Sequence, residues 1–464
     1  MTVKIPRSLF LIRVALAAAA AAVVAGAAPG AQQPPPQPPP QQPSVVTLTI
    51  TGDNGTAPRL AVPDFIPLSQ DAETAAVAKA IGQVLYDDLN FEREFALIPR
   101  DTYATIPRAT SLADVPFARW RELNADGLVV GTVEKVGTGV RVQVRLFEVS
   151  SQKSAFGQEY TGSAANPRLY AHTIADEIHQ QQRGLAGVAR TKIAFDSDRD
   201  GERVGGTIQE RSAKEVYFAD YDGENQRRLT VYKSLNIMPA WSPDGRSIAY
   251  ISFRGQRGGN IFIANIFQGT QDDLTEHKGE NWLPAWSPDG TRIAFSSTRN
   301  GNPDIYIANR DGSNVRQLTD NRAIDTSPTW APSGAQIAFV SDRSGSPQIY
   351  VVGVDGTGVR KITSEPNCDR PTWSPPPYNE IAFASRTGPG LDIKVIDLAT
   401  NAVRQMTFSE GSNESPSWAP NGRHLAFSST RAGKTQIFTM ARDGKDIRQI
   451  TRTGNNYEPD WSKK

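Results

Sequence analysis

Short apolar runs recur at a fixed period over the second half of the chain. Each unit opens with a tryptophan and a turn such as SPDG, and continues with an IAF-like run, an IYIA-like run and an LT-like pair. The tryptophans lie 43 to 45 residues apart: Trp241, Trp286, Trp330, Trp373, Trp418 and Trp461. Four short strands in about 44 residues are the unit of a β-propeller blade.

The two ends of this repeat are out of phase. Residues 193–230 contain three of the runs without a preceding tryptophan, and the C-terminal EPDWS at residues 458–462 is a tryptophan strand without the other three. Together they complete one blade. The pattern therefore predicts a six-bladed propeller over residues 190–464, in which the C-terminal strand closes the ring and leaves no open end.

Residues 44–189 mix two periodicities. Residues 71–89 have helical spacing with Asp71 as a candidate N-cap, and a second helix is expected near residues 169–182. Residues 140–149 alternate strictly between apolar and polar, and residues 45–50, 59–65 and 127–136 are also typical of strands. We expect a compact α/β domain with a mixed sheet.

The first residues have the pattern of an export signal. Lys4, Arg7 and Arg13 precede an apolar, alanine-rich run, and small residues at 25–27 fit a cleavage site. Residues 1–27 are therefore predicted to be a signal peptide directing the chain to the periplasm, the alternative being a retained anchor. Residues 28–43 are rich in Pro and Gln, which suits an extended linker or, alternatively, a ligand of a proline-binding domain.

Composition and motifs argue against several function classes. The net charge of +1 provides no electrostatic case for nucleic acid, and Cys368 as the only cysteine excludes an intramolecular disulfide. Serine-hydrolase, zinc-protease and phosphate-loop motifs are absent, and only four histidines occur. We therefore expect a protein that is not an enzyme.

Most repeated residues are expected to be structural. The tryptophans are predicted to pack between blades. An arginine that recurs after each IAF-like run is predicted to make a polar contact within or between blades: Arg199, Arg254, Arg299, Arg343, Arg386 and Arg431.

The unrepeated loops just before each tryptophan strand are the candidate functional site. They should emerge around one mouth of the propeller channel, and five of the six carry a carboxylate: Glu280, Asp325, Asp369, Glu414 and Glu458. Such a ring would favour a cation or a basic protein surface, and Trp282 and Tyr457 add aromatic anchors. The alternative interpretation is that these are ordinary solvated loop charges.

The whole pattern resembles the TolB family of the Tol-Pal system. Residues 212–230 (SAKEVYFADYDGENQRRLT) and the terminal EPDWS are especially similar, and the α/β domain in front of the propeller adds to the likeness. The resemblance implies a periplasmic adaptor that supports outer-membrane integrity, cell division and protein import. It implies binding of a peptidoglycan-associated lipoprotein, Pal, at the propeller mouth, through positions that match Glu280, Asn281, Trp282, Asp325 and Thr326.

The resemblance also implies a second partner. The N-terminal segment of the family binds TolA, an inner-membrane protein, and corresponds here to Val45, Val46, Thr47 and Leu48, behind the Pro/Gln-rich linker. No cofactor is required, although the resemblance and the carboxylates both allow calcium in the channel. The alternative function is a propeller-type periplasmic hydrolase or a carbohydrate- or peptide-binding protein.

Overall fold

The structure is a computed structural model that describes residues 48–52, 56–204, 212–254, 258–275 and 278–463. The predicted signal peptide and the Pro/Gln-rich linker lie outside these ranges. Within them, no helix is long and apolar enough to span a membrane.

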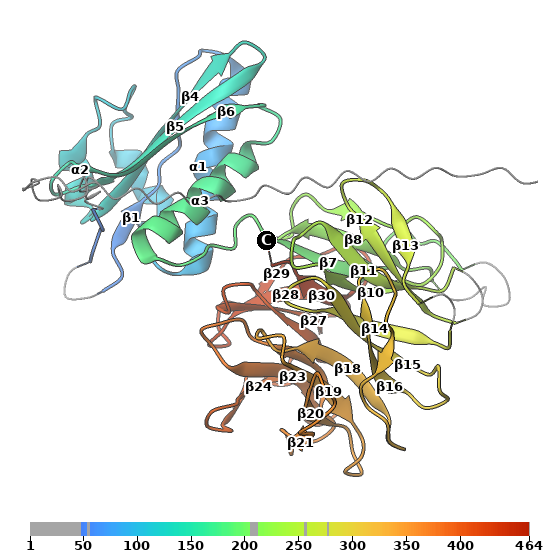
Figure 1. Cartoon of the computed structure of the whole chain (residues 1–464). Helices are drawn as coiled ribbons and strands as arrows, with labels where there is room; N and C mark the ends of the chain where they lie inside the picture. The colour runs from blue at the N-terminus through green and yellow to red at the C-terminus, as the bar shows by residue number, and fades with distance from the viewer. Residues whose placement is uncertain (1–47, 53–55, 205–211, 255–257, 276–277, 464) are drawn as a thin grey trace, which may run out of the picture. The chain divides into compact units, whose positions relative to one another are not determined.

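The N-terminal domain is built on one mixed sheet (Figure 1). β1 runs parallel to β3 and β4, whereas β4, β5 and β6 are antiparallel neighbours. Its strands are β1 (Arg59–Ala61), β2 (Ile66–Pro67), β3 (Ala96–Leu97), β4 (Gly127–Val136), β5 (Gly139–Glu148) and β6 (Ser154–Gly162). The mixed sheet is confirmed, but residues 48–50 are not in a strand.

Helices cover one face of this sheet and shorter segments cover the other. On the first face, α1 (Ala72–Glu92) and α3 (Pro167–Arg183) pack Ile81 and Ile178 into a buried cluster with the sheet. The Asp71 side chain accepts a hydrogen bond from the Thr74 amide, which confirms the predicted N-cap. On the second face, Trp120 of α2 (Phe117–Glu122) lies in another buried cluster, against which Tyr103 of the 3₁₀ helix η2 (Arg100–Thr105) packs.

The remaining strands form six four-stranded antiparallel sheets, which confirms the six-bladed propeller (Figure 1). The first is β30 (Asn456–Trp461), β7 (Lys192–Ser197), β8 (Glu215–Asp220), β9 (Arg227–Arg228); the second is β10 (Asn236–Trp241), β11 (Ser247–Ser252), β12 (Asn260–Asn265), β13 (Gln271–Asp273); the third is β14 (Asn281–Trp286), β15 (Arg292–Ser297), β16 (Asp304–Asn309), β17 (Arg316–Gln317). The fourth is β18 (Asp325–Trp330), β19 (Gln336–Ser341), β20 (Gln348–Gly353), β21 (Arg360–Lys361); the fifth is β22 (Asp369–Trp373), β23 (Glu380–Arg386), β24 (Leu391–Asp397), β25 (Val403–Gln405); the sixth is β26 (Asn413–Trp418), β27 (His424–Ala432), β28 (Lys434–Ala441), β29 (Arg448–Gln449).

The C-terminal strand closes the ring, as the phase of the repeat predicted. β30 pairs antiparallel with β7, so that the innermost strand of the first blade comes from the other end of the propeller sequence. Trp461 on β30 is fully buried, and its indole N–H donates to the Thr191 hydroxyl at 2.7 Å. Its backbone amide donates to the Ser417 hydroxyl of the neighbouring blade at 2.9 Å.

The repeated tryptophans and arginines have structural roles. The indole N–H of Trp286 donates to the Ala240 carbonyl of the preceding blade at 3.0 Å, and Trp330 and Trp418 make the equivalent bond. Arg299 lies over the rings of Phe295 and Tyr306, and its guanidinium donates to the Ser297 hydroxyl. The same arrangement recurs at Arg199, Arg343 and Arg431. These contacts confirm that the repeated arginine is structural in four blades.

A buried polar network joins α1 and α3 to the first blade. Asp88 of α1 contacts His172 of α3 through Nδ1 at 2.8 Å and accepts a hydrogen bond from the Tyr221 hydroxyl at 2.8 Å. The other imidazole nitrogen of His172 lies 3.6 Å from Asp220 at the end of β8, and Arg168 also faces Asp220. Burial lowers the pKa of His172, but the carboxylates of Asp220 and Asp88 outweigh this and raise the pKa to about 9.

Removal of the closing tryptophan should destabilise the whole propeller. We expect Trp461→Ala to lower the free energy of unfolding by roughly 3–5 kcal/mol, because a fully buried indole and its hydrogen bond are lost together. Urea unfolding followed by circular dichroism measures this. Trp282→Ala is the matched control: Trp282 is only half-buried, so its loss should lower the free energy of unfolding much less.

Deletion of residues 457–464 should prevent stable folding. A truncated chain with an unchanged melting temperature would contradict the closure of the ring by the C-terminal strand.

The His172 network should make stability depend on pH in the weakly alkaline range. Because the folded state raises the pKa of His172 from 6.5 to about 9, its stabilising contribution is complete below pH 6.5 and disappears as pH rises toward 9. We expect the melting temperature of the native chain to fall over this interval more than that of His172→Gln. His179→Gln is the control on the same helix, because burial lowers the pKa of His179 to about 4 and it does not titrate there. Parallel curves for the native chain and His172→Gln would refute the assignment.

Candidate functional site

The six innermost strands share one backbone irregularity where they line the channel cavity. In each strand the register shifts just before the proline of the P-x-W sequence. The residue at this point has a positive φ between 51° and 59°, which is uncommon for residues other than glycine. We call these six residues the inner ring: Met238, Leu283, Ser327, Arg370, Ser415 and Glu458. All six line the channel cavity, whose volume is about 480 Å³.

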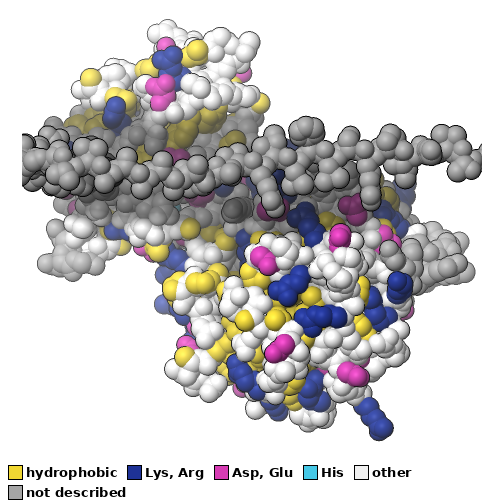
Figure 2. Space-filling model, in the orientation of Figure 1, with side chains coloured by type: hydrophobic (Ala, Val, Ile, Leu, Met, Phe, Trp, Pro, Cys, Tyr) yellow, Lys and Arg dark blue, Asp and Glu magenta, His cyan; other side chains and the backbone are white. Residues whose placement is uncertain are grey.

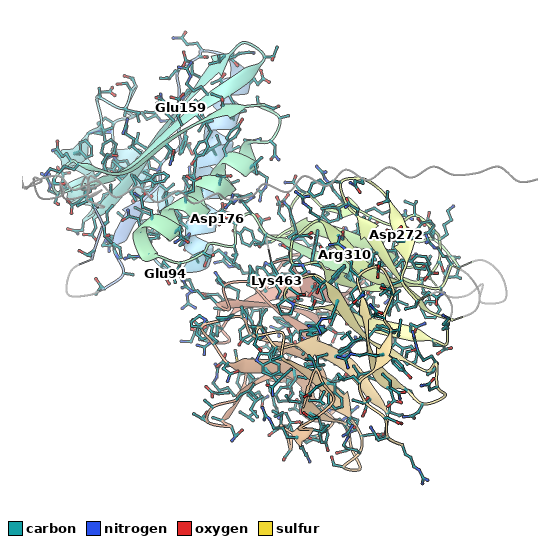
Figure 3. The ribbon with its side chains drawn as sticks, in the orientation of Figure 1. Glu94, Glu159, Asp176, Asp272, Arg310 and Lys463 are labelled. Carbon is teal, nitrogen blue, oxygen red and sulfur yellow. The ribbon has the colours of Figure 1, made fainter. Side chains whose placement is uncertain are left out.

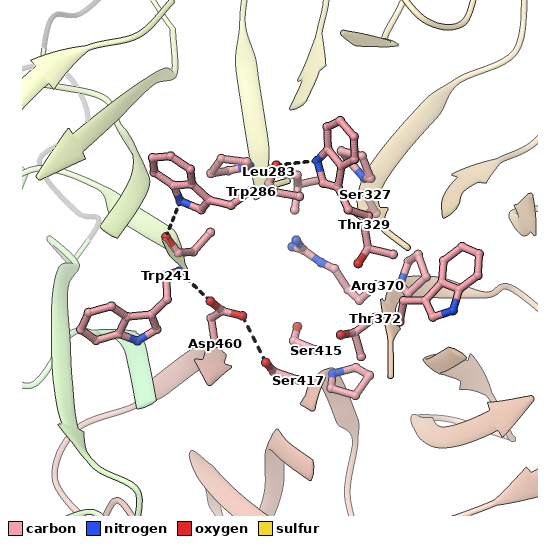
Figure 4. Close-up of a pocket in the computed structure, with 18 of the residues that line it drawn as sticks. Trp241, Leu283, Trp286, Ser327, Thr329, Arg370, Thr372, Ser415, Ser417 and Asp460 are labelled. Atoms are coloured by element: carbon pink, nitrogen blue, oxygen red, sulfur yellow. Dashed lines mark hydrogen bonds between the residues drawn. The ribbon is translucent and has the colours of Figure 1, made fainter. Parts of the chain in front are cut away.

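An ion pair crosses the channel at the level of the inner ring. The guanidinium of Arg370 donates to the Glu458 carboxylate at 2.8 Å, joining the inner strands β22 and β30. Figure 4 shows Arg370 extended toward the middle of the cavity. Two positions after Glu458, the Asp460 carboxylate accepts hydrogen bonds from the Trp241 backbone amide at 2.7 Å and from the Ser417 hydroxyl at 3.1 Å (Figure 4). The wall of the channel cavity therefore carries an ion pair and several hydroxyl groups beside its prolines and tryptophans.

The residue preceding each inner-ring residue forms a second set at the mouth, which we call the outer ring. Its members are all half-buried or exposed: Ile237, Trp282, Thr326, Asp369, Glu414 and Tyr457. Because the blades follow one another around the ring, Tyr457, Ile237 and Trp282 occupy three consecutive blades and form an apolar arc. Asp369 and Glu414 occupy two consecutive blades on the other side and form an acidic arc. The backbone at the mouth therefore repeats from blade to blade, whereas the chemistry of the side chains differs from one side of the mouth to the other.

Two of the predicted mouth residues lie inside the blades. Asn281 and Asp325 are fully buried, where each binds the repeated arginine of its own blade. The Asp325 carboxylate accepts from the Arg343 guanidinium at 2.8 Å and from the side-chain amide of Asn321 at 2.7 Å. Burial and the nearby Asp325 raise the pKa of Asp304 to about 6. The Asp325 side chain is thus engaged within the structure.

The other carboxylates are spread around the mouth. Glu280 is exposed beside the strand start, Asp369 accepts from the Ser327 hydroxyl at 3.0 Å, and Glu414 accepts from the Ser412 hydroxyl at 2.7 Å. Glu458 is held by Arg370. Across the described ranges, no three His, Cys, Asp or Glu side chains are grouped in a way that could hold a metal ion. The five carboxylates therefore do not converge on a calcium site.

Tyr457 is backed by an ion pair between Lys214 and the buried Asp196. The Lys214 ammonium lies 3.3 Å from the centre of the Tyr457 ring and 3.1 Å from the buried Asp196 carboxylate. Burial raises the pKa of Asp196 to about 6, although Lys214 opposes the shift. The cation–π contact holds the tyrosine ring in place at the end of the apolar arc.

Sequence reasoning missed Ile237 of the outer ring and every inner-ring residue except Glu458, including Arg370. Ile237 and Arg370 stand at the same distance from their tryptophans as Trp282 and Glu458 do, so an alignment of the six repeats points to both. Which residues lie beside them in the ring, however, is decided only by the closed structure.

Of the predicted N-terminal segment, residues 45–47 lie outside the described ranges. The Leu48 carbonyl accepts a hydrogen bond from the Gln182 side chain at 3.2 Å.

Comparisons with known proteins agree with this architecture. A family described as the TolB beta propeller domain matches residues 180–375 and 365–464, and the TolB amino-terminal domain matches residues 46–155. The crystal structure of TolB from Acinetobacter baumannii is 26% identical, with a TM-score of 0.74 over 88% of this chain and 97% of that one.

Curated relatives give the same family. The Tol-Pal system protein TolB of Desulfosudis oleivorans is 34% identical over 45% of this chain and 45% of that protein, and that of Nitrosococcus oceani is 31% identical over 49% of each. The chain thus spans about half the length of the curated relatives it matches. Because the family descriptions cover most of its length and both of its domains, the chain belongs to the TolB family of the Tol-Pal system.

Proposed function

We propose that this chain is a non-enzymatic adaptor of the Tol-Pal system in the periplasm, which binds a Pal-type peptidoglycan-associated lipoprotein at the mouth of its propeller. The observation that carries the proposal is the outer ring, with its apolar arc of Tyr457, Ile237 and Trp282 facing the acidic arc of Asp369 and Glu414. Aromatic anchors beside unpaired charges are typical of protein–protein interfaces.

The chemistry of the mouth specifies the surface that it would accept. The apolar arc suits an aliphatic or aromatic side chain of the partner, and the acidic arc suits a lysine or arginine beside it. Figure 2 shows basic and acidic side chains interspersed over the propeller surface that faces the viewer, in keeping with the net charge of +1. An approaching partner would therefore be oriented by the local asymmetry of the mouth.

The proposal includes a second contact through the N-terminal segment. Val45, Val46, Thr47 and Leu48 would bind a TolA-type inner-membrane protein, with the Pro/Gln-rich linker ahead of them. The adaptor would then connect inner-membrane and peptidoglycan-bound components and support outer-membrane integrity, cell division and protein import. Support for this part comes from family membership.

Substitutions in the outer ring should weaken lipoprotein binding in two distinguishable ways. We expect Trp282→Ala to raise the Kd of the soluble domain of the organism's own Pal-type lipoprotein on the order of tenfold or more, chiefly through faster dissociation. We expect Asp369→Asn with Glu414→Gln to slow association and to flatten its salt dependence. Surface plasmon resonance at several salt concentrations measures both.

Matched controls lie away from the mouth. Phe267→Ala removes an aromatic side chain that is 75% exposed in the turn between β12 and β13, at the opposite end of its blade. Asp272→Asn removes an exposed charge from the outermost strand β13 (Figure 3). Both should bind as the native chain does. Native affinity and salt dependence in the outer-ring variants would contradict a docking site at the mouth.

The N-terminal segment can be tested separately. Deletion of residues 45–47 should abolish binding of the C-terminal domain of a TolA-type protein while leaving lipoprotein binding unchanged, because these residues lie outside both rings. Substitution of the same residues by a Gly-Ser-Gly sequence of equal length distinguishes lost contacts from lost reach. Retained binding by both variants would show that another part of the chain makes this contact.

A further inference from the structure

The N-terminal domain contains a second cavity, on the face of its sheet that α1 and α3 do not cover. Its volume is about 510 Å³, within the range of small-molecule sites. The walls come from residues 63–67, from η2 and the loop that follows it, and from residues 115–120, while Val130 of β4 contributes from the sheet. Neither proposed partner contact uses this cavity.

The cavity wall is predominantly apolar and aromatic. Trp120 and Tyr103 meet edge to face, with ring centroids 5.0 Å apart. The Tyr103 hydroxyl is already used, since it donates to the Ile98 carbonyl at 2.8 Å and accepts from the Val62 amide at 3.0 Å. Its ring, with Phe65 and four prolines, therefore offers apolar surface to the cavity: Pro63, Pro67, Pro107 and Pro116.

Two hydrogen-bond donors in this wall lack partners. Arg100 pairs with Asp64 through Nη2, and its guanidinium lies over the Tyr86 ring, but Nη1 is buried without an acceptor. Trp120 lines the cavity as well, and its indole N–H makes no hydrogen bond with the described residues. A buried arginine N–H normally finds an acceptor. Arg100 thus leaves an unmet demand for an acceptor at the cavity, and the Trp120 indole N–H is available to donate to the same ligand.

The charge around the cavity has the sign that such an acceptor requires. Arg100 and Arg108 line it, and Asp64 is the only acidic residue among the described ones that does. Asp64 is engaged by Arg100, whereas Arg108 has no ion-pair partner among the residues that the structure describes. The lining therefore carries one uncompensated positive charge.

We propose that this cavity binds a small apolar monocarboxylate. The aliphatic or aromatic body of the ligand would lie against Trp120, Tyr103 and the prolines, and its carboxylate would accept from Arg100, Trp120 and Arg108. Arg100 and the indole would supply directed donors, and Arg108 would supply charge at the exposed rim. A neutral or cationic ligand of the same shape would leave these donors unpaired and would bind less tightly.

Trp120 provides a direct readout, because the other seven tryptophans of the chain lie in the propeller. Titration of the mature chain with 4-phenylbutyrate should shift the Trp120 indole N–H resonance, which is assigned by its disappearance in Trp120→Phe. We expect 4-phenylbutanol and 4-phenylbutylamine to bind at least tenfold more weakly than the acid. No shift at millimolar acid, or equal affinity for acid and alcohol, would overturn the proposal.

Variants separate anion recognition from cavity volume. Arg100→Gln should weaken binding of 4-phenylbutyrate at least tenfold while leaving the affinity for 4-phenylbutanol nearly unchanged. Ala104→Phe, at an exposed position of η2 that lines the cavity, should exclude both probes by filling it. Arg119→Gln is the matched control, since Arg119 is exposed on α2, pairs only with Glu122 and does not line the cavity. Native binding by Ala104→Phe would place the probe elsewhere and refute the site, even if Arg100→Gln proves unstable.

Discussion

The pairing of β30 with β7 is the interaction on which the rest of the propeller depends. Blades pack face to face, and an open ring would leave an apolar blade face uncovered on each side of the gap. The pairing fills that gap and buries Trp461 completely. The same strand carries Glu458 and Asp460 into the channel, so that closure of the ring and completion of the channel lining occur together.

The residues of the closed ring have two kinds of role, one structural and one in recognition. Tryptophans, repeated arginines and buried residues such as Asn281 and Asp325 hold each blade to itself or to its neighbour. The side chains of the two rings differ from blade to blade, although their backbone is nearly the same. Recognition can therefore vary at the mouth without altering the scaffold, which is how one fold supports many different binding surfaces.

The N-terminal domain is joined to this ring by buried polar contacts as well as apolar packing. Asp88 lies between His172 and Tyr221, so its carboxylate is removed from water and compensated by directed partners. Such a network also penalises misaligned packing, because a displaced partner leaves a buried charge unpaired. Among the residues that the structure describes, η2, α2 and loops cover the opposite face of the same sheet, and there the second cavity remains.

The sequence by itself determined the blade count, the closing strand, the Asp71 cap and the structural arginine, because each follows from a local period or a short-range contact. Only the tertiary structure decided that Asp325 is buried, that Arg370 meets Glu458 across the channel, and that the outer ring divides into an apolar and an acidic arc. Arg370 and Glu458 are 88 positions apart in the chain, and no periodicity specifies which side chains face one another across a cavity. Closure of the ring brings them together, and the chemistry of the mouth follows from that closure.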